Sequence, residues 1–197
     1  MSLDEDPDRA LEFATEAKRK AGRVPAVREA LGLTAYAAGD YALALSELRA
    51  VRRMTGDDDL IPVMADCERG LGRPRKALEL IADANESSLD EATRVECLIV
   101  ASGARRDLGQ ADAALVLLQV SALNARRSEP WLARLRYAYA DTLTDLGRLG
   151  DARTWFERAA AVDAEGETDA ADRLAAMDGV VFDDDWIESD SDEVASD

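Results

Sequence analysis

The sequence predicts an all-α protein, an α-solenoid of antiparallel helical hairpins with no sheet. Alanine, leucine and arginine dominate the 197 residues and β-branched residues are sparse, which favours closely packed helices. Glycine interrupts apolar helical patterns four times, at intervals of 33, 37 and 38 residues. A small residue and then a bulky one follow each of these glycines at fixed distances, which indicates a repeated helix-turn-helix unit.

Each copy of the unit carries the same signature. The glycines that end the first helix are Gly39, Gly72, Gly109 and Gly147. Five residues later stand Ala44, Ala77, Ala114 and Ala152, and four residues after those stand Leu48, Ile81, Leu118 and Phe156. The glycine permits a tight turn, the alanine lets two helices approach closely, and the bulky side chain fills the groove between them. Because one hairpin cannot bury its own apolar face, we expect the copies to stack.

Ten helices follow from this register within a helical domain over residues 1–178. It comprises a half repeat over 7–22, repeats over about 25–58, 59–91, 92–127 and 128–165, and a closing helix over 168–178. The longer intervals of the third and fourth copies require extra residues in their helices or connecting loops. Ser88 with Glu91 predicts a capping box for the third copy, and Thr168 predicts the N-cap of the closing helix.

The first copy resembles the tetratricopeptide repeat (TPR), a 34-residue helix-turn-helix motif. The matching residues in the motif's register are Leu31-Gly32, Gly39-Asp40-Tyr41, Ala44 and Leu48. The fourth copy is similar in its second helix, whereas the second and third lack the Leu-Gly pair. The resemblance covers residues 25–165 and implies a right-handed superhelix whose first helices line a concave groove. An irregular helical bundle is the alternative.

Charge restricts the partners that this chain can take. The formal net charge is −17, which argues against a phosphate-binding surface and hence against a nucleic-acid partner. No apolar stretch is long enough to cross a bilayer, and the N-terminus is acidic where a signal peptide would be basic, so we expect a cytoplasmic protein that does not enter a membrane. The segment 179–197 carries eight acids and no base, which predicts an acidic disordered tail.

The chemistry of an enzyme is hard to find in this sequence. The chain has no histidine, which removes the commonest general base and metal ligand. Cys67 and Cys97 have no framework spacing and are interpreted as free thiols, and the Asp57–Asp59 run lacks the spacing of a calcium loop. We therefore predict no catalytic residue, no cofactor and no metal site.

The expected function is a non-enzymatic protein–protein interaction module or scaffold that binds a peptide or helix in its concave groove. The resemblance places five candidate partner-binding residues in that groove: Tyr36, Arg69, Arg106, Arg134 and Tyr137. Two interpretations of the arginines stay open, since they could form ion pairs with nearby acids or hold a bound segment. The sequence identifies no particular partner, and self-association into a homodimer through the edges of the superhelix is a further alternative.

A second functional hypothesis concerns the tail. A purely solvating tail gains nothing from apolar residues, yet the acids here surround a candidate motif of Phe182, Trp186 and Ile187. Such a motif could bind a partner protein or this chain's own groove. The alternative function is therefore a regulator whose acidic C-terminal tail occupies a basic surface of a partner protein.

Overall fold

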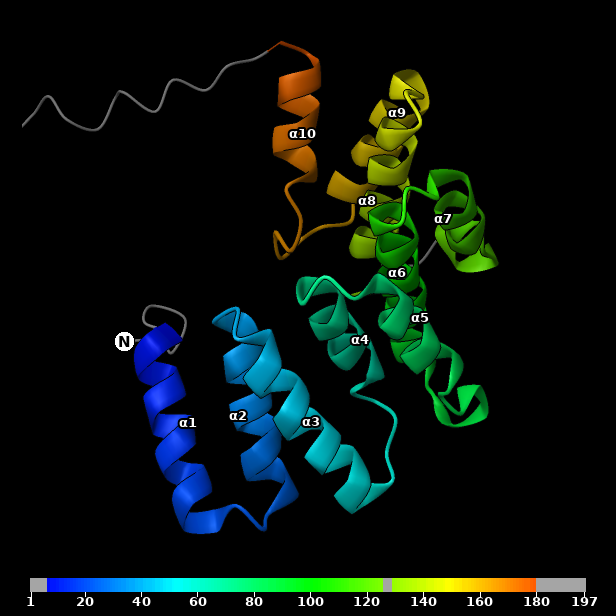
Figure 1. The fold of residues 1–197 in the computed structure, drawn as a ribbon. Coiled ribbons are helices and arrows are strands. Elements are labelled where there is room, and N and C mark those ends of the chain that lie inside the picture. Colours follow the sequence, from blue (N-terminus) through cyan, green and yellow to red (C-terminus); the bar gives the residue numbers. More distant parts are fainter. Residues whose placement is uncertain (1–6, 126–128, 180–197) are drawn as a thin grey trace, which may run out of the picture.

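The computed structural model describes residues 7–125 and 129–179, which form an all-α solenoid without strands (Figure 1). The helices are α1 (Pro7–Ala21), α2 (Pro25–Ala37), α3 (Tyr41–Thr55), α4 (Ile61–Gly70), α5 (Pro74–Ala82), α6 (Glu91–Asp107), α7 (Ala111–Leu118), α8 (Leu132–Asp145), α9 (Leu149–Ala160) and α10 (Ala170–Met177). The predicted fold class is confirmed. The predicted tail and its motif of Phe182, Trp186 and Ile187 lie outside the described residues.

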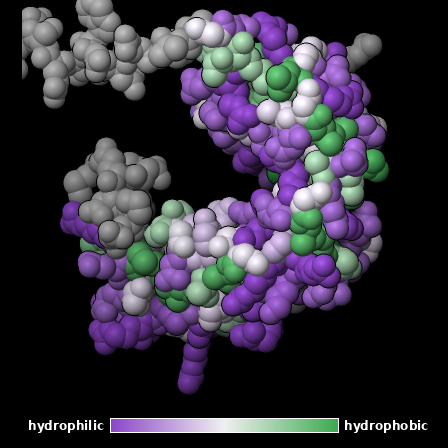
Figure 2. Space-filling view, turned by 45° about the horizontal axis from the view of Figure 1, so that its top comes forward, coloured by the Kyte–Doolittle hydropathy of each residue, from purple (hydrophilic) through white to green (hydrophobic). Residues whose placement is uncertain are grey.

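The helices pack as four hairpins in a row, α2–α3, α4–α5, α6–α7 and α8–α9, with α1 and α10 at the two ends. The first helices of successive hairpins also contact one another, α4 with α6 and α6 with α8. The stack curves into a C, and Figure 2 shows its hollow side and the mainly hydrophilic surface around it. Apolar burial is divided into clusters along the row, as expected for a solenoid in which each repeat packs on its neighbours.

The four hairpin turns have one geometry. Each predicted turn glycine adopts a left-handed backbone, with φ between +70° and +76°. In the first turn the N–H of Gly39 donates to the carbonyl of Tyr36 and the N–H of Asp40 donates to the carbonyl of Ala35. The same pair of bonds recurs around the other three glycines, which makes each turn a Schellman motif. Gly179, with φ of +74°, ends α10 in the same left-handed conformation.

The alanines of the signature lie where paired helices are closest. Ala44, Ala77, Ala114 and Ala152 are each 0% exposed. In the first repeat Gly32 adds to the close approach, because a Cβ built there would lie 2.7 Å from the Cδ2 of Leu48 on the facing helix. The predicted roles of alanine and of the bulky residue after it therefore hold in this hairpin.

The long repeat intervals are explained by two short 3₁₀ segments. Glu86–Ser88 joins α5 to α6, and Ser121–Asn124 follows α7. The extra residues of the third and fourth copies thus lie in connections, while the hairpins themselves keep their register.

Both predicted N-caps are wrong. The cap of α6 is Asp90, whose carboxylate accepts from the N–H of Thr93 at 2.7 Å, while the hydroxyl of Ser88 donates to the carbonyl of Asn85. At the closing helix, the hydroxyl of Thr168 donates to Asp163 at 2.6 Å. This contact holds Thr168 in the preceding loop, so α10 begins at Ala170, two residues after the predicted start of 168.

Replacing a buried signature alanine should destabilise the protein. Ala44→Leu and Ala152→Leu each add three carbons at a site with no exposed surface, so each should lower the free energy of unfolding by about 1–3 kcal/mol. Urea unfolding followed by circular dichroism measures the change. Ala113→Leu, at an exposed position of α7, is the matched control and should stay close to the parent. Unchanged stability of both buried variants would contradict the hairpin register.

Candidate functional site

The concave face is the surface presented by the first helices α2, α4, α6 and α8 and by α10. A network of polar contacts runs along it from one repeat to the next. At the N-terminal side, the hydroxyl of Tyr36 on α2 donates to Asp66 Oδ2 on α4 at 2.6 Å. Arg69, one turn further along α4, donates to the other oxygen of Asp66 at 2.8 Å. Tyr36 and Arg69 therefore meet at one carboxylate.

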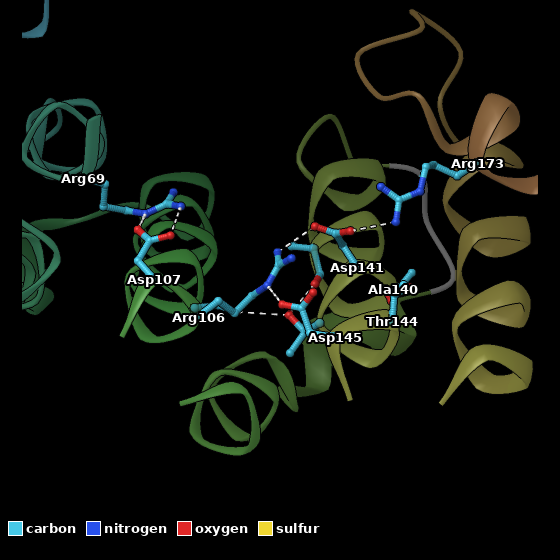
Figure 3. A network of polar contacts seen from close by, with 11 residues as sticks. Arg69, Arg106, Asp107, Ala140, Asp141, Thr144, Asp145 and Arg173 are labelled. Atoms are coloured by element: carbon cyan, nitrogen blue, oxygen red, sulfur yellow. Dashed lines mark hydrogen bonds and ion pairs between the residues drawn. The ribbon is translucent and has the colours of Figure 1, made fainter. Parts of the chain in front are cut away.

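The network continues from α4 across α6 and α8 to α10 (Figure 3). Arg69 Nε donates to Asp107 Oδ2 on α6 at 2.8 Å. Arg106 on α6 pairs with two carboxylates of α8, Asp141 at 2.7 Å and Asp145 at 2.5 Å. Arg173 on α10 contacts the second oxygen of Asp141 at 3.0 Å. Each of these pairs joins two neighbouring units of the solenoid.

Arg134 forms a second bridge on the same face. It pairs with Glu96 on α6 at 2.7 Å and with Glu167, in the loop before α10, at 3.0 Å. Burial is the largest influence on Glu96 and raises its pKa, against the opposing effect of Arg134. The structure thus shows all three candidate arginines, Arg69, Arg106 and Arg134, in ion pairs with two carboxylates each. Their part in binding a partner stays a prediction.

Four of the five candidate residues surround one hollow of about 340 Å³. Arg69, Arg106, Arg134 and Tyr137 line it together with the less polar Ile99 and Ala138. The fifth candidate, Tyr36, is not in its lining and lies beyond Asp66, where its ring packs against that of Tyr41 with centroids 6.0 Å apart. The predicted set therefore divides into a hollow bounded by α4, α6, α8 and the loop before α10, and a separate tyrosine on α2.

Both candidate tyrosines are held in the neutral form. Tyr137 packs edge-on against Phe156, with ring centroids 5.3 Å apart. Burial, followed by its contact with the Asp169 carboxylate, raises the pKa of Tyr137 to about 12. The pKa of Tyr36 is raised further, first by burial and then by its hydrogen bond to Asp66. Both hydroxyls are therefore hydrogen-bond donors over the whole physiological pH range.

Gly103 has a role that the sequence did not reveal. It lines the hollow on the concave face, where the lack of a side chain leaves space. A Cβ built on Gly103 would lie 2.4 Å from Arg69 Cζ, so the guanidinium of Arg69 lies directly against the α6 backbone. Arg173 and Glu167 were also missed, because both follow the last recognised repeat.

A signal for the arginine contacts does exist once the repeats are aligned on their turn glycines. Arg69 and Arg106 stand three residues before Gly72 and Gly109. Their partners Asp107 and Asp145 stand two residues before the turn glycine of the following repeat. The arginine three residues before one turn glycine therefore contacts the aspartate two residues before the next turn glycine.

The described residues contain no candidate metal site, no reactive thiol and no membrane-spanning helix. No group of three or more potential ligands among them could hold a metal ion. Cys67 and Cys97 are buried free thiols, and burial raises their pKa to about 12 and about 11, so neither is a thiolate at neutral pH. No helix in this part of the chain has the length and apolar character needed to span a membrane.

Comparison with solved structures gives a match at the level of the fold. The chain is similar to the crystal structure of a thermophilic TPR protein of Thermus thermophilus, with a TM-score of 0.67 over 86% of this chain and 89% of that one. This chain has a TPR fold. The identity of 22% limits that likeness to the fold. No protein-family model and no curated protein sequence matches the chain.

Gly103→Ala tests the space that Arg69 occupies. The new methyl group should push the guanidinium away from Asp107 while improving helix propensity, so the net change in stability should stay within about 1 kcal/mol. A double-mutant cycle on Arg69 and Asp107 should give a coupling of about 0.2–1 kcal/mol in the parent and none in Gly103→Ala. Gly150→Ala, with open space around its Cβ, is the control and should retain the coupling. Equal coupling in both variants would disprove this account.

The raised pKa values of Tyr36 and Tyr137 should make the free energy of unfolding depend on pH. Because their folded pKa values exceed the ordinary value of 10.0, they contribute stability that is present below about pH 10 and lost as the pH rises toward 12. Tyrosinate absorbance measures the ionisation directly. Tyr137→Phe should remove a titration step near pH 12, whereas the parent unfolded in guanidinium should show tyrosines that ionise near pH 10. A Tyr137 that ionises near pH 10 in the folded protein would contradict its burial.

Proposed function

We propose that the protein is a non-catalytic interaction module that binds a peptide or helix of another protein along its concave face. The observation that supports this function is the hollow of about 340 Å³ that the candidate residues line. A TPR fold commonly serves protein–protein interaction, and a site built on stacked helices needs little backbone change on binding. The network between repeats would hold the side chains of the hollow in place before a ligand arrives.

The charges on this face favour a basic segment. Seven carboxylates take part in or border the network: Asp66, Glu96, Asp107, Asp141, Asp145, Glu167 and Asp169. They outnumber the four guanidinium groups of Arg69, Arg106, Arg134 and Arg173. Since each arginine is already matched by acids, the excess charge is negative. A Lys- or Arg-rich ligand would find unused acceptor oxygens, while an acidic ligand would have to displace existing ion pairs.

The hollow itself supplies an apolar anchoring point. Ile99, Ala138 and the ring of Tyr137 line it between the charged pairs. A bound segment would insert one apolar or aromatic side chain there and place its basic residues over the carboxylates to either side. This arrangement combines a central anchor with a polar rim, as in other protein interfaces.

A display library of random peptides tests both parts of the proposal. Selected peptides should share basic residues beside one bulky apolar residue, and their binding should weaken with added salt. Ala138→Phe fills the hollow and should weaken the binding of a selected peptide by about tenfold or more.

The matched control is Ala113→Phe, at an exposed position of the outer helix α7, which should bind as the parent does. Circular dichroism of both variants confirms that they fold. Selected peptides that are acidic, or that bind Ala138→Phe and the parent equally, would refute the proposed site.

A further inference from the structure

A second arginine cluster lies away from the concave face, and its charges are not balanced. Arg49 and Arg53 on α3 and Arg73 at the α4–α5 turn line a hollow of about 280 Å³, which we call the arginine pocket. The rest of its lining is Ala42, Leu45, Ser46 and Leu71, with no acidic side chain among them. The pocket therefore has an apolar floor and a cationic rim.

A single buried carboxylate positions two of these arginines. Glu68, 1% exposed, receives a bond from Arg49 at 2.6 Å and has Arg73 Nη1 at 3.6 Å from its second oxygen. That second oxygen, Oε2, has no hydrogen-bond partner among the described residues. The side chain of Arg53, on the exposed side of α3, forms no ion pair or hydrogen bond with any other described residue. One negative charge therefore faces three positive charges, in contrast to Arg69, Arg106 and Arg134 on the concave face, which have two carboxylates each.

The C-terminal sequence has the features that such a pocket would bind. Residues 183–188 read Asp-Asp-Asp-Trp-Ile-Glu, which places one large aromatic side chain between acids. An indole can cover an apolar floor and stack with arginine side chains, while carboxylates pair with guanidinium groups. The same segment would be repelled by the acidic excess of the concave face, so Arg69, Arg106 and Arg134 are poor partners for it.

The reach of the chain decides which molecule supplies the segment. Trp186 lies seven residues beyond Gly179, so an extended chain carries it at most about 25 Å from the end of α10. The pocket lies between α3 and the α4–α5 turn. Figure 1 shows α3 in the lower arm of the C and α10 at the end of the upper arm. Packed helices are about 8–10 Å apart, and three helices, α6, α8 and α10, follow α4 along the stack before the segment begins. A second copy can present the segment without this constraint.

We propose that the acidic C-terminal segment of one copy binds the arginine pocket of a second copy, with Trp186 on the floor formed by Ala42, Leu45 and Leu71. The carboxylates of residues 183–185 and of Glu188 then pair with Arg49, Arg53 and Arg73. Because the two surfaces differ, the contact is head-to-tail and can continue from one copy to the next. The concave face stays open in such an assembly.

Contact quenching of a bimane label by tryptophan tests the proposal in the full-length protein. Ser46→Cys places the label at the pocket, and Cys67 and Cys97 are buried thiols with raised pKa values that react slowly. The labelled copy also carries Trp186→Phe, so any quenching by this tryptophan comes from another molecule. Adding unlabelled parent should quench the label in a saturable and salt-sensitive manner, and adding unlabelled Trp186→Phe should not.

Charge reversal identifies the pocket. Arg53→Glu in the labelled copy should abolish the quenching, whereas Arg23→Glu, an equal change at an exposed site outside the pocket, should leave it intact. Light scattering should show a mass that rises with concentration for the parent and for Arg23→Glu but not for Arg53→Glu.

Three results would overturn the proposal. One is no Trp186-dependent quenching at Ser46→Cys. Another is quenching only when the label and Trp186 share a chain, which would assign the segment to its own molecule. The third is equal or stronger quenching of a label at Ala138→Cys, which would place the segment in the concave hollow instead.

Discussion

The close approach of two helices beneath each turn glycine is the constraint on which the rest of the structure depends. An αL glycine reverses the chain, and an alanine with no exposed surface lets the returning helix lie against the first one. A hairpin formed in this way still has apolar side chains on both flanks, so it is stable only between two neighbours. Stacking follows from this requirement, and the order of the stack places every first helix on the same side.

That placement explains the concave network. Successive repeats stack in the same orientation. A residue type that recurs at one position of the repeat therefore contacts the residue type that recurs at a second position of the following repeat. Arginine three residues before the turn glycine meets aspartate two residues before the next one, as in Arg69–Asp107 and Arg106–Asp145. In the first repeat Tyr36 takes the arginine's position and donates to Asp66 instead. The network is thus a property of the repeat rather than of any single helix.

The features that the sequence predicted are those that a short local pattern determines. One hairpin contains the whole pattern: a glycine at a helix end, an alanine five residues later and a bulky residue after that. The turns at Gly39, Gly72, Gly109 and Gly147 could therefore be placed from the sequence alone. The caps failed because several competent residues lie close together, and tertiary packing selects among them. Ser88 and Asp90 are both good N-cap residues, and the 3₁₀ segment before α6 leaves only Asp90 at the helix start.

The candidate site was predictable in part for the same reason. The TPR register placed Arg69, Arg106, Arg134 and Tyr137 on one face, but it said nothing of how their charges are matched. Arg69–Asp107, Arg106–Asp145 and Arg134–Glu96 join residues that are 38 or 39 positions apart, and Glu167 lies in the loop after the last repeat. The space left by Gly103 was also invisible, because it concerns a side chain from the preceding repeat.

The ion pairs along the inner side have a mechanical consequence. Apolar packing between hairpins is not weakened by electrostatic screening, whereas the pairs that cross from α4 to α6 to α8 to α10 are partly exposed and are screened by dissolved ions. These ion pairs link neighbouring repeats only weakly on the concave side, while hydrophobic contacts hold the hairpins together. We expect that screening these pairs leaves every helix folded but allows the curvature of the solenoid to vary, so that the curvature should depend on ionic strength and on any cation that competes for the same carboxylates.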